Sequence, residues 1–263
     1  MGMIDEPGAS RHGLRAASAM AVALLLGLAG AANAGEVAVA VAANFAGSLA
    51  RIAEGFASST GHSLKITAGS TGKFYSQIVA GAPFEVLLAG DDETPRKLIA
   101  EGRAVAGSSF TYATGVLVLW SATPGFVDDQ GAVLAAGRFN KLAIANPKLA
   151  PYGLAAVQVL RARGLAEVVA PKLVTGESIA QAYQFVATGN AELGFVALSQ
   201  VIGTGPGKPV GSYWRVPASL HGEIRQDAVL LKPGEKNPAA AALLAYLKSA
   251  PAKAVIQAGG YRL

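Results

Sequence analysis

The stretch "EVAVAVAANFAGSLARIAEGF" (36–56) joins an apolar strand to an amphipathic helix through a short turn. Its opening residues form a largely apolar run that predicts a strand, and Leu49, Ile52 and Phe56 recur at the spacing of one helical face. The small polar turn Ala43-Asn44-Phe45 lies between the two elements. A strand that runs directly into a helix is the building unit of an α/β fold.

Similar units recur along the chain. The predicted strands are 36–42, 64–68, 84–90, 115–120, 141–146, 192–198, 213–217 and 227–231. The predicted helices are 48–56, 74–80, 94–102, 153–164, 177–189, 237–250 and 251–259, with Thr94 as the N-cap of the third. This alternation predicts an α/β fold with mostly parallel sheets, and such sheets bind ligands beyond the carboxyl ends of their strands.

Residues 1–34 are typical of a signal peptide. Arg11 and Arg15 precede the apolar segment 16–31, and "ANA" (32–34) is a small-x-small cleavage site. We therefore expect a mature chain that begins at Gly35 and a periplasmic location. No later stretch is long and apolar enough to predict insertion of the mature chain into a membrane.

The composition excludes several classes of site. The chain of 263 residues has no Cys, which removes disulfides, thiolate metal sites and Cys nucleophiles together. Its formal net charge of +5 favours an anionic partner only weakly, because the basic residues are scattered. Without a basic cluster interleaved with aromatic residues, nucleic acid is not an expected partner.

The segment "GSTGK" (69–73) is similar to a nucleotide-binding P-loop but lacks two of its required residues. A P-loop needs Gly where this chain has Thr67, and Ser or Thr where it has Phe74. A Gly-rich turn that leads into a helix still presents backbone N–H groups and the positive end of the helix dipole to an anion. We expect Lys73 to steer anions towards the site without contacting the ligand.

Four strand-to-helix turns carry small, neutral hydrogen-bond donors. They are Ala43-Asn44-Phe45, the segment 69–72 with Ser70 and Thr71, the segment 146–153 with Tyr152, and the segment 175–178 before Ile179. Each residue alone is explained by helix capping or ordinary burial. Together they predict a site for a fully ionised dianion, which only accepts hydrogen bonds.

The segments 42–102, 146–156, 192–198 and 244–261 resemble the periplasmic molybdate-binding proteins of ABC importers. The resemblance covers essentially the whole mature chain. It implies a periplasmic-binding-protein fold of two α/β lobes joined by hinge strands, with residues 35–115 plus 227–263 in one lobe and 116–226 in the other. The oxyanion would lie between them.

The resemblance also implies the site residues. They are Asn44, Ser70 and Thr71 from the first lobe, and the backbone N–H groups of Tyr152 and Ile179 from the second. Some members supply a Tyr hydroxyl where this chain has Ala197, and Tyr152 is the alternative source of a phenol. The metal of the ligand would be held only as an oxyanion, without direct metal-ion ligands.

The implied function is the capture of molybdate and tungstate for a membrane permease, by a monomer without enzyme activity or a cofactor. A sulfate- or phosphate-binding protein is one alternative, and an exported phosphoester hydrolase is another. The hydrolase would need metal ligands or a nucleophile paired with a base, and the sequence indicates neither. Asp91, Asp92 and Glu93 are interpreted as helix-capping residues rather than metal ligands, and His62 and His221 are isolated.

Overall fold

The computed structural model describes residues 1–3, 34–202 and 211–263. Apart from residues 1–3 and 34, the predicted signal peptide lies outside the described residues, and so does the predicted loop 203–210. Residues Gly35–Leu263 form one compact unit.

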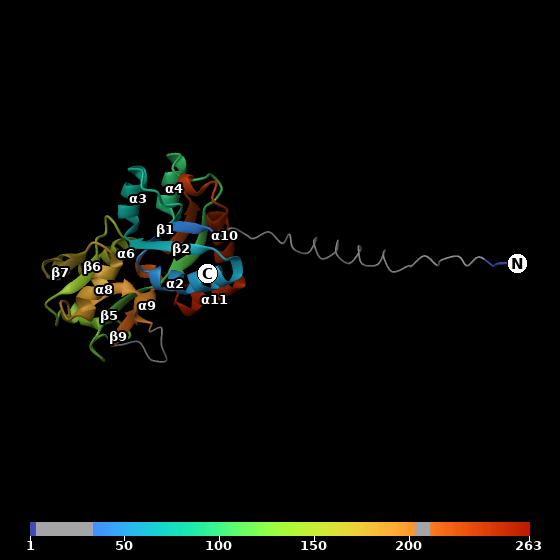
Figure 1. The fold of residues 1–263 in the computed structure, drawn as a ribbon. Coiled ribbons are helices and arrows are strands. Elements are labelled where there is room, and N and C mark those ends of the chain that lie inside the picture. The colour runs from blue at the N-terminus through green and yellow to red at the C-terminus, as the bar shows by residue number, and fades with distance from the viewer. Residues whose placement is uncertain (4–33, 203–210) are drawn as a thin grey trace. The chain divides into compact units, whose positions relative to one another are not determined.

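The first lobe is built on a five-stranded sheet of order β2-β1-β3-β10-β4. Its strands are β1 (Glu36–Ala42), β2 (Ser63–Gly69), β3 (Val86–Leu88), β4 (Phe110–Gly115) and β10 (Ile224–Leu230). Its helices are α2 (Ala46–Thr60), α3 (Thr71–Val79), α4 (Glu93–Ala100), the 3₁₀ turn η3 (Lys232–Gly234), α10 (Pro238–Leu247) and α11 (Ala250–Ala258). Successive side chains of β1 point to opposite faces of the sheet, and both faces are packed. Val39 contacts the core beneath α2, α10 and α11, whereas Ala40 contacts the core beneath α3 and α4. Figure 1 shows these two layers of helices.

The second lobe is built on a five-stranded sheet of order β7-β6-β8-β5-β9. Its strands are β5 (Leu117–Ser121), β6 (Leu142–Ala145), β7 (Leu173–Gly176), β8 (Leu193–Ala197) and β9 (Ser212–Arg215). Its helices are α5 (Ala132–Ala136), α6 (Pro151–Ala162), α7 (Ala166–Val169), α8 (Ile179–Ala187) and α9 (Leu198–Val201), with 3₁₀ turns η1 (Ala170–Lys172) and η2 (Ala218–Leu220). Buried residues of α6 and α8 form part of this lobe's core.

The two sheets have the same pattern of pairing. In each sheet the first three strands are parallel and the last two are joined by antiparallel pairs. The two-lobed α/β prediction is confirmed; each sheet is mixed, because one strand, β10 in the first and β5 in the second, runs against the other four. The reason lies in the connections between the lobes: the chain leaves the first sheet at Gly115, enters the second at Leu117, and returns through β10.

The carboxyl ends of the parallel strands are tied together in the same way in both lobes. In the first lobe, the Ala43 N–H donates to the Gly69 carbonyl at 2.9 Å. In the second lobe, the Asn146 N–H donates to the Gly176 carbonyl at 2.7 Å. The four predicted polar turns therefore begin at two equivalent pairs of strand ends, one pair in each lobe.

Among the described residues, no single helix is long and apolar enough to cross a membrane. The helices α10 and α11 reach that length and composition only as a pair, which is bent by 61° at the break between them.

Candidate functional site

All five residues predicted for the site line one small pocket between the lobes. The pocket has an empty volume of about 210 Å³, part of it open to solvent, and is lined by Ala42, Ala43, Asn44, Gly69, Ser70, Thr71, Ala150, Pro151, Tyr152 and Ile179. None of these described residues carries a charged side chain. The pocket therefore presents backbone amides and hydroxyls from the ends of both sheets to whatever it encloses.

The Ser70 hydroxyl has no hydrogen-bond partner among the described residues. Ser70 is the N-cap residue of α3, yet its side chain makes no capping hydrogen bond. It is 4% exposed, and its Oγ is the one buried side-chain atom in the described residues that lacks a partner. An unsatisfied buried hydroxyl costs about 1–3 kcal/mol, so its persistence in a pocket indicates a group that a ligand satisfies.

The Thr71 hydroxyl is oriented as a donor. Its Oγ1 accepts a hydrogen bond from the Gly90 N–H at 2.9 Å, and Thr71 is 1% exposed. Because that lone pair is occupied, the hydroxyl proton is available to an acceptor. Thr71 is also the first residue of α3, and the N–H groups of a first helical turn have no acceptor within the helix.

The second lobe contributes two helix N-termini. The first hydrogen bond of α6 comes from the Gly153 N–H to the Ala150 carbonyl, and that of α8 from the Ala182 N–H to the Ser178 carbonyl. Within the described part of the chain, the N–H groups of Tyr152 and Ile179 donate no hydrogen bond. Both belong to the positive ends of helix dipoles, which attract an anion.

Asn44 faces its own lobe with its side chain. The two amide protons go to Gln226 Oε1 at 2.9 Å and to the Tyr261 hydroxyl at 3.1 Å. The Ala43 N–H donates to the Gly69 carbonyl and the Phe45 N–H to the Ala42 carbonyl, whereas the Asn44 N–H donates no hydrogen bond to the described residues. The donor that this turn offers to the pocket is thus the backbone N–H of Asn44.

The Tyr152 hydroxyl lies at the junction of the lobes. It accepts a hydrogen bond from Gln226 Nε2 at 3.3 Å and lies against Gly115, where a Cβ atom would overlap it. Burial raises the pKa of the Tyr152 hydroxyl well above its usual value, so the group stays a neutral phenol. Ala197, where the resemblance implies a missing phenol, does not line the pocket in the described structure.

Direct contacts hold the two lobes together beside the pocket. The Gly72 N–H donates to the Leu149 carbonyl at 3.0 Å, and the Ser199 hydroxyl donates to the Asn44 carbonyl at 3.0 Å. A Cβ on Gly72 would lie 3.0 Å from the Leu149 Cα, so glycine is needed here for the approach of the other lobe. Lys73 Nζ lies 2.9 Å from a carboxylate oxygen of Glu177, across the same boundary.

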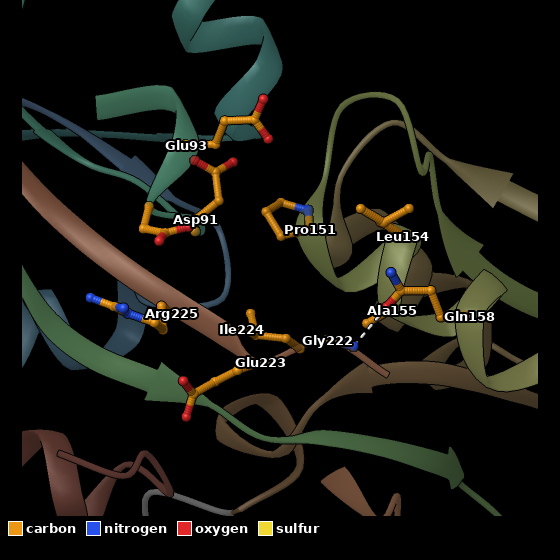
Figure 2. A pocket seen from close by; sticks show the side chains of 12 residues that line it. Asp91, Glu93, Pro151, Leu154, Ala155, Gln158, Gly222, Glu223, Ile224 and Arg225 are labelled. Carbon is orange, nitrogen blue, oxygen red and sulfur yellow. Dashed lines mark hydrogen bonds between the residues drawn. The ribbon is translucent and has the colours of Figure 1, made fainter. Parts of the chain in front are cut away.

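A second, larger pocket, which Pro151 also lines, has mostly acidic charged residues (Figure 2). It encloses about 490 Å³ and is lined by the carboxylates of Asp91, Asp92, Glu93 and Glu223, with Arg225. Burial raises the pKa of Asp91, while hydrogen bonds from Thr94 act in the opposite direction. Four carboxylates around one cation do not suit a dianion, because like charges repel.

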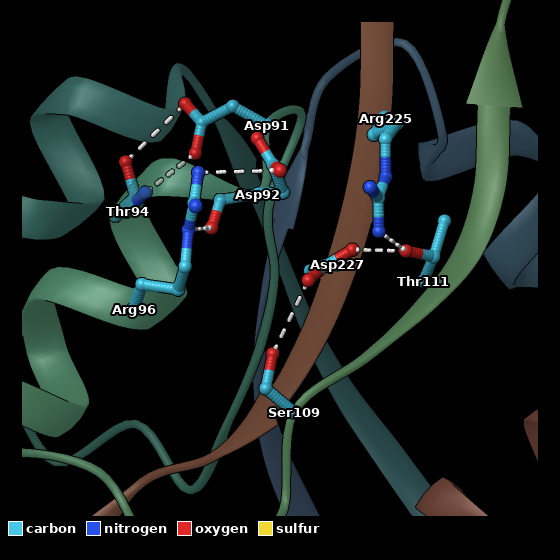
Figure 3. Close-up of polar contacts among 8 residues, drawn as sticks. All are labelled: Asp91, Asp92, Thr94, Arg96, Ser109, Thr111, Arg225 and Asp227. Carbon is cyan, nitrogen blue, oxygen red and sulfur yellow. Dashed lines mark hydrogen bonds and ion pairs between the residues drawn. The ribbon is translucent and has the colours of Figure 1, made fainter.

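The acidic cluster caps a helix, as Figure 3 shows. Asp91 accepts hydrogen bonds from the Thr94 N–H at 2.8 Å and the Thr94 hydroxyl at 3.2 Å. The predicted N-cap is wrong: α4 begins at Glu93 with Asp92 as N-cap, because the Asp91 carboxylate satisfies the first-turn donors. In the described residues, no group of three or more His, Cys, Asp or Glu side chains is arranged to hold a metal ion.

Two other titratable residues have structural partners. His62 Nδ1 accepts a hydrogen bond from the Gly35 N–H at 3.0 Å. Asp227, buried in β10, accepts hydrogen bonds from the Thr111 hydroxyl at 2.7 Å and the Ser109 hydroxyl at 3.4 Å (Figure 3). Neither residue lines the small pocket.

Two mixed-sheet lobes that meet around a small pocket of neutral donors define a two-lobed solute-binding protein. The match to the model of bacterial extracellular solute-binding proteins extends over residues 37–262. The chain belongs to this family, and within it to the ModA-type proteins with which it shares most of its length.

Three similar proteins are described as molybdate-binding proteins. The chain is 62% identical over 247 residues to a molybdate-binding protein ModA of Azotobacter vinelandii, covering 94% of this chain and 98% of the relative. It is 54% identical over 245 residues to a molybdate-binding protein ModA of Rhodobacter capsulatus, covering 93% and 95%. A solved structure of a periplasmic molybdate-binding protein of Azotobacter vinelandii has a TM-score of 0.84 and 44% identity, covering 86% of this chain and 99% of that one.

Family membership answers two of the predictions. The family consists of solute-binding proteins, which confirms that the chain is not an enzyme and removes the phosphoester hydrolase as an alternative. It also assigns the protein to the compartment outside the cytoplasmic membrane.

Proposed function

We propose that this protein captures molybdate, with tungstate as a second ligand, and delivers it to the permease of an ABC importer. The observation that carries the proposal is the unpartnered Ser70 hydroxyl in a pocket that offers donors from both lobes and no charge. The relatives at 62% and 54% identity, both described as molybdate-binding proteins, indicate which oxyanion the pocket holds.

The proposed contacts are all donors. The first lobe gives the Ser70 and Thr71 hydroxyls and the Asn44 N–H, and the second gives the N–H groups of Tyr152 and Ile179. A fully ionised tetrahedral dianion accepts from every one of them, and hydrogen bonds to a charged acceptor are the stronger kind. Because the Tyr152 phenol lies against Gly115 and Gln226, which do not line the pocket, we assign the ligand contact of Tyr152 to the backbone alone.

The same donors discriminate between oxyanions in two ways. Hydrogen phosphate carries a proton near neutral pH and needs an acceptor, but the described lining residues include no carboxylate. Sulfate is a dianion like molybdate, but its bonds to oxygen are shorter. We propose that selection between these two rests on the size of the closed pocket, since their hydrogen-bonding needs are the same.

The remaining parts of the proposal concern the whole chain. We propose that residues 1–34 are removed as a signal peptide and that the mature protein acts in the periplasm as a monomer. The predicted lobes, 35–115 with 227–263 and 116–226, would close on the anion about the connections at Gly115 and just before β10. Residues 224–226 go with the first lobe, because β10 is a strand of its sheet. The strand β10 already pairs with β4 from Ile224 onwards, which favours a hinge just before that residue.

Titration calorimetry on the ligand-free mature protein tests the proposal. We expect tight 1:1 binding of molybdate and tungstate, and weak or undetectable binding of sulfate and phosphate. Binding of sulfate more tightly than molybdate would contradict the assigned ligand, and equal binding of all four would contradict selection by pocket size.

A further inference from the structure

Gln226 is a buried polar residue that the proposed contacts do not use. It is 0% exposed and lies in β10, the strand through which the chain returns from the second lobe to the first sheet. It does not line the small pocket, yet it contacts two of the residues that do. A buried amide in the middle of a sheet is costly unless each of its groups has a partner.

The Gln226 amide is bonded to both lobes. Its Oε1 accepts from Asn44 Nδ2 at 2.9 Å and from the Tyr112 hydroxyl at 3.0 Å, both within the first lobe. Its Nε2 donates to the Tyr152 hydroxyl at 3.3 Å, at the start of α6 in the second lobe. One side chain therefore connects the turn that carries the Asn44 N–H with the helix that carries the Tyr152 N–H.

The Tyr152 hydroxyl lies against the connection between the lobes. A Cβ on Gly115 would overlap that hydroxyl and lie 2.8 Å from Gln226 Nε2. Gly115 is the last residue of β4, and only Val116 separates it from the start of β5 in the second sheet. The phenol thus reaches Gln226 only where the two lobes approach each other at the hinge.

The Asn44 turn is fixed by the same network. The Tyr261 hydroxyl contacts the Asn44 carbonyl at 2.6 Å, and Ser199 of the second lobe donates to this carbonyl. Gln226 holds the Asn44 side chain, and the two hydroxyls hold the Asn44 carbonyl. Together these bonds fix the turn and therefore the direction of the Asn44 N–H. Small errors in donor placement weaken anion binding, so this support has a functional consequence.

We infer that Gln226 is a positioning residue that couples lobe closure to the oxyanion site. It orients the Asn44 turn in every state, and its bond to Tyr152 forms only when the second lobe closes. This inference rests on the proposed function, because closure is driven by the anion. An amide suits the role because it combines an acceptor for two first-lobe donors with a donor for the second lobe.

A double-mutant cycle tests the coupling. The variants Tyr152→Phe, Gln226→Met and the double variant are titrated with molybdate, and their ligand-free forms are unfolded in urea. We expect Tyr152→Phe to weaken affinity by roughly threefold to tenfold, the range for one hydrogen bond, and Gln226→Met to weaken it more, because it also releases the Asn44 side chain. The double variant should lose less than the product of the two single effects. In the ligand-free unfolding the two effects should simply add.

Tyr112→Phe is the matched control, because it removes another bond to Gln226 that stays within the first lobe. It should lower the urea midpoint while changing molybdate affinity less than Tyr152→Phe does. Additive affinity losses, or equal coupling in ligand-free unfolding, would overturn the role of Gln226 alone. A wild-type protein that does not bind molybdate would overturn both this inference and the proposed function.

Discussion

The two lobes carry a serine at the same place and use it differently. Ser70 and Ser178 are both N-cap residues of the helix that follows the outer parallel strand. The Ser178 hydroxyl caps its helix by accepting from the Gln181 N–H at 3.3 Å, whereas the Ser70 hydroxyl has no partner. The comparison separates a structural serine from a functional one, because a hydroxyl committed to its own helix has one lone pair fewer for other uses.

The lobes also differ in the kind of donor that they bring to the pocket. The first contributes two side-chain hydroxyls as well as backbone N–H groups, and the second contributes backbone N–H groups from two helix starts. Backbone donors depend on the fold and tolerate most substitutions, whereas hydroxyls are lost with a single change. Affinity should therefore be more sensitive to side-chain substitution in the first lobe than in the second.

The largest effect is expected for Ser70→Ala. It removes one charge-assisted hydrogen bond to the anion, and such bonds contribute about 1.5–3 kcal/mol, or roughly tenfold to a hundredfold in affinity. Because no intramolecular bond is lost and the cost of an unsatisfied buried hydroxyl is removed, the ligand-free protein should be at least as stable as wild type. Calorimetry and urea unfolding measure the two quantities on the same sample.

Ser178→Ala gives the opposite pattern and serves as its control. Loss of a helix cap should destabilise the ligand-free protein by about 1 kcal/mol while leaving molybdate affinity near wild type. If both variants lowered stability equally and neither changed affinity, the functional distinction between the two serines would be wrong.

The sequence was sufficient to predict the turns that form the site, but not to distinguish the roles of Ser70 and Ser178. The apolar strands and glycine-bounded helices predicted the four turns, and a strand-to-helix turn has a definite place at the end of a parallel sheet. Ser70 and Ser178 nevertheless have the same local pattern. Whether a hydroxyl turns to its own helix or to a pocket depends on contacts from the other lobe.

Sequence patterns missed the strands β4 and β7 and the contact that Gln226 makes with Asn44. The strand β4 has a mixed composition, "FTYATG" (110–115), and β7 has only four residues, so neither gives a strong periodic signal. Gln226 contacts Asn44 across 182 positions in the sequence, which no local pattern reports. One signal was present: adjacent Gln and Asp within the apolar strand "IRQDAVL" are unusual unless both are bonded.

An intermediate effect is expected for Ile179→Pro, which tests the backbone donors of the second lobe. Ile179 is the first residue of α8, where proline is tolerated, and Ser178 before it has the extended φ of −145° and ψ of 167° that a following proline favours. The change removes one N–H donor to a charged acceptor, so affinity should fall by about tenfold, the lower end of the range for such a bond. Ile179→Ala, which keeps the N–H and also truncates the buried side chain, is the control measured in parallel, and an equal loss in both would show that the N–H is not a contact.

The smallest effect is expected at the surface, where Lys73 and Glu177 join the two lobes. Their side chains are 51% and 59% exposed, and exposed ion pairs contribute about 0–1 kcal/mol, so Lys73→Gln should weaken molybdate binding less than about fivefold. The effect should fade at about 1 M salt, where charges are screened beyond roughly 3 Å.

The variant Glu177→Gln tests whether Lys73 bridges the two lobes or only steers anions towards the pocket. If the pair stabilises the closed lobes, both variants weaken binding and the double variant is no worse than either alone. If Lys73 only steers anions towards the pocket, removal of the Glu177 charge should instead raise the association rate, because a like charge has been taken from the path of the dianion. Stopped-flow binding at low and high salt separates these outcomes, and faster association in Glu177→Gln would contradict a bridge between the lobes.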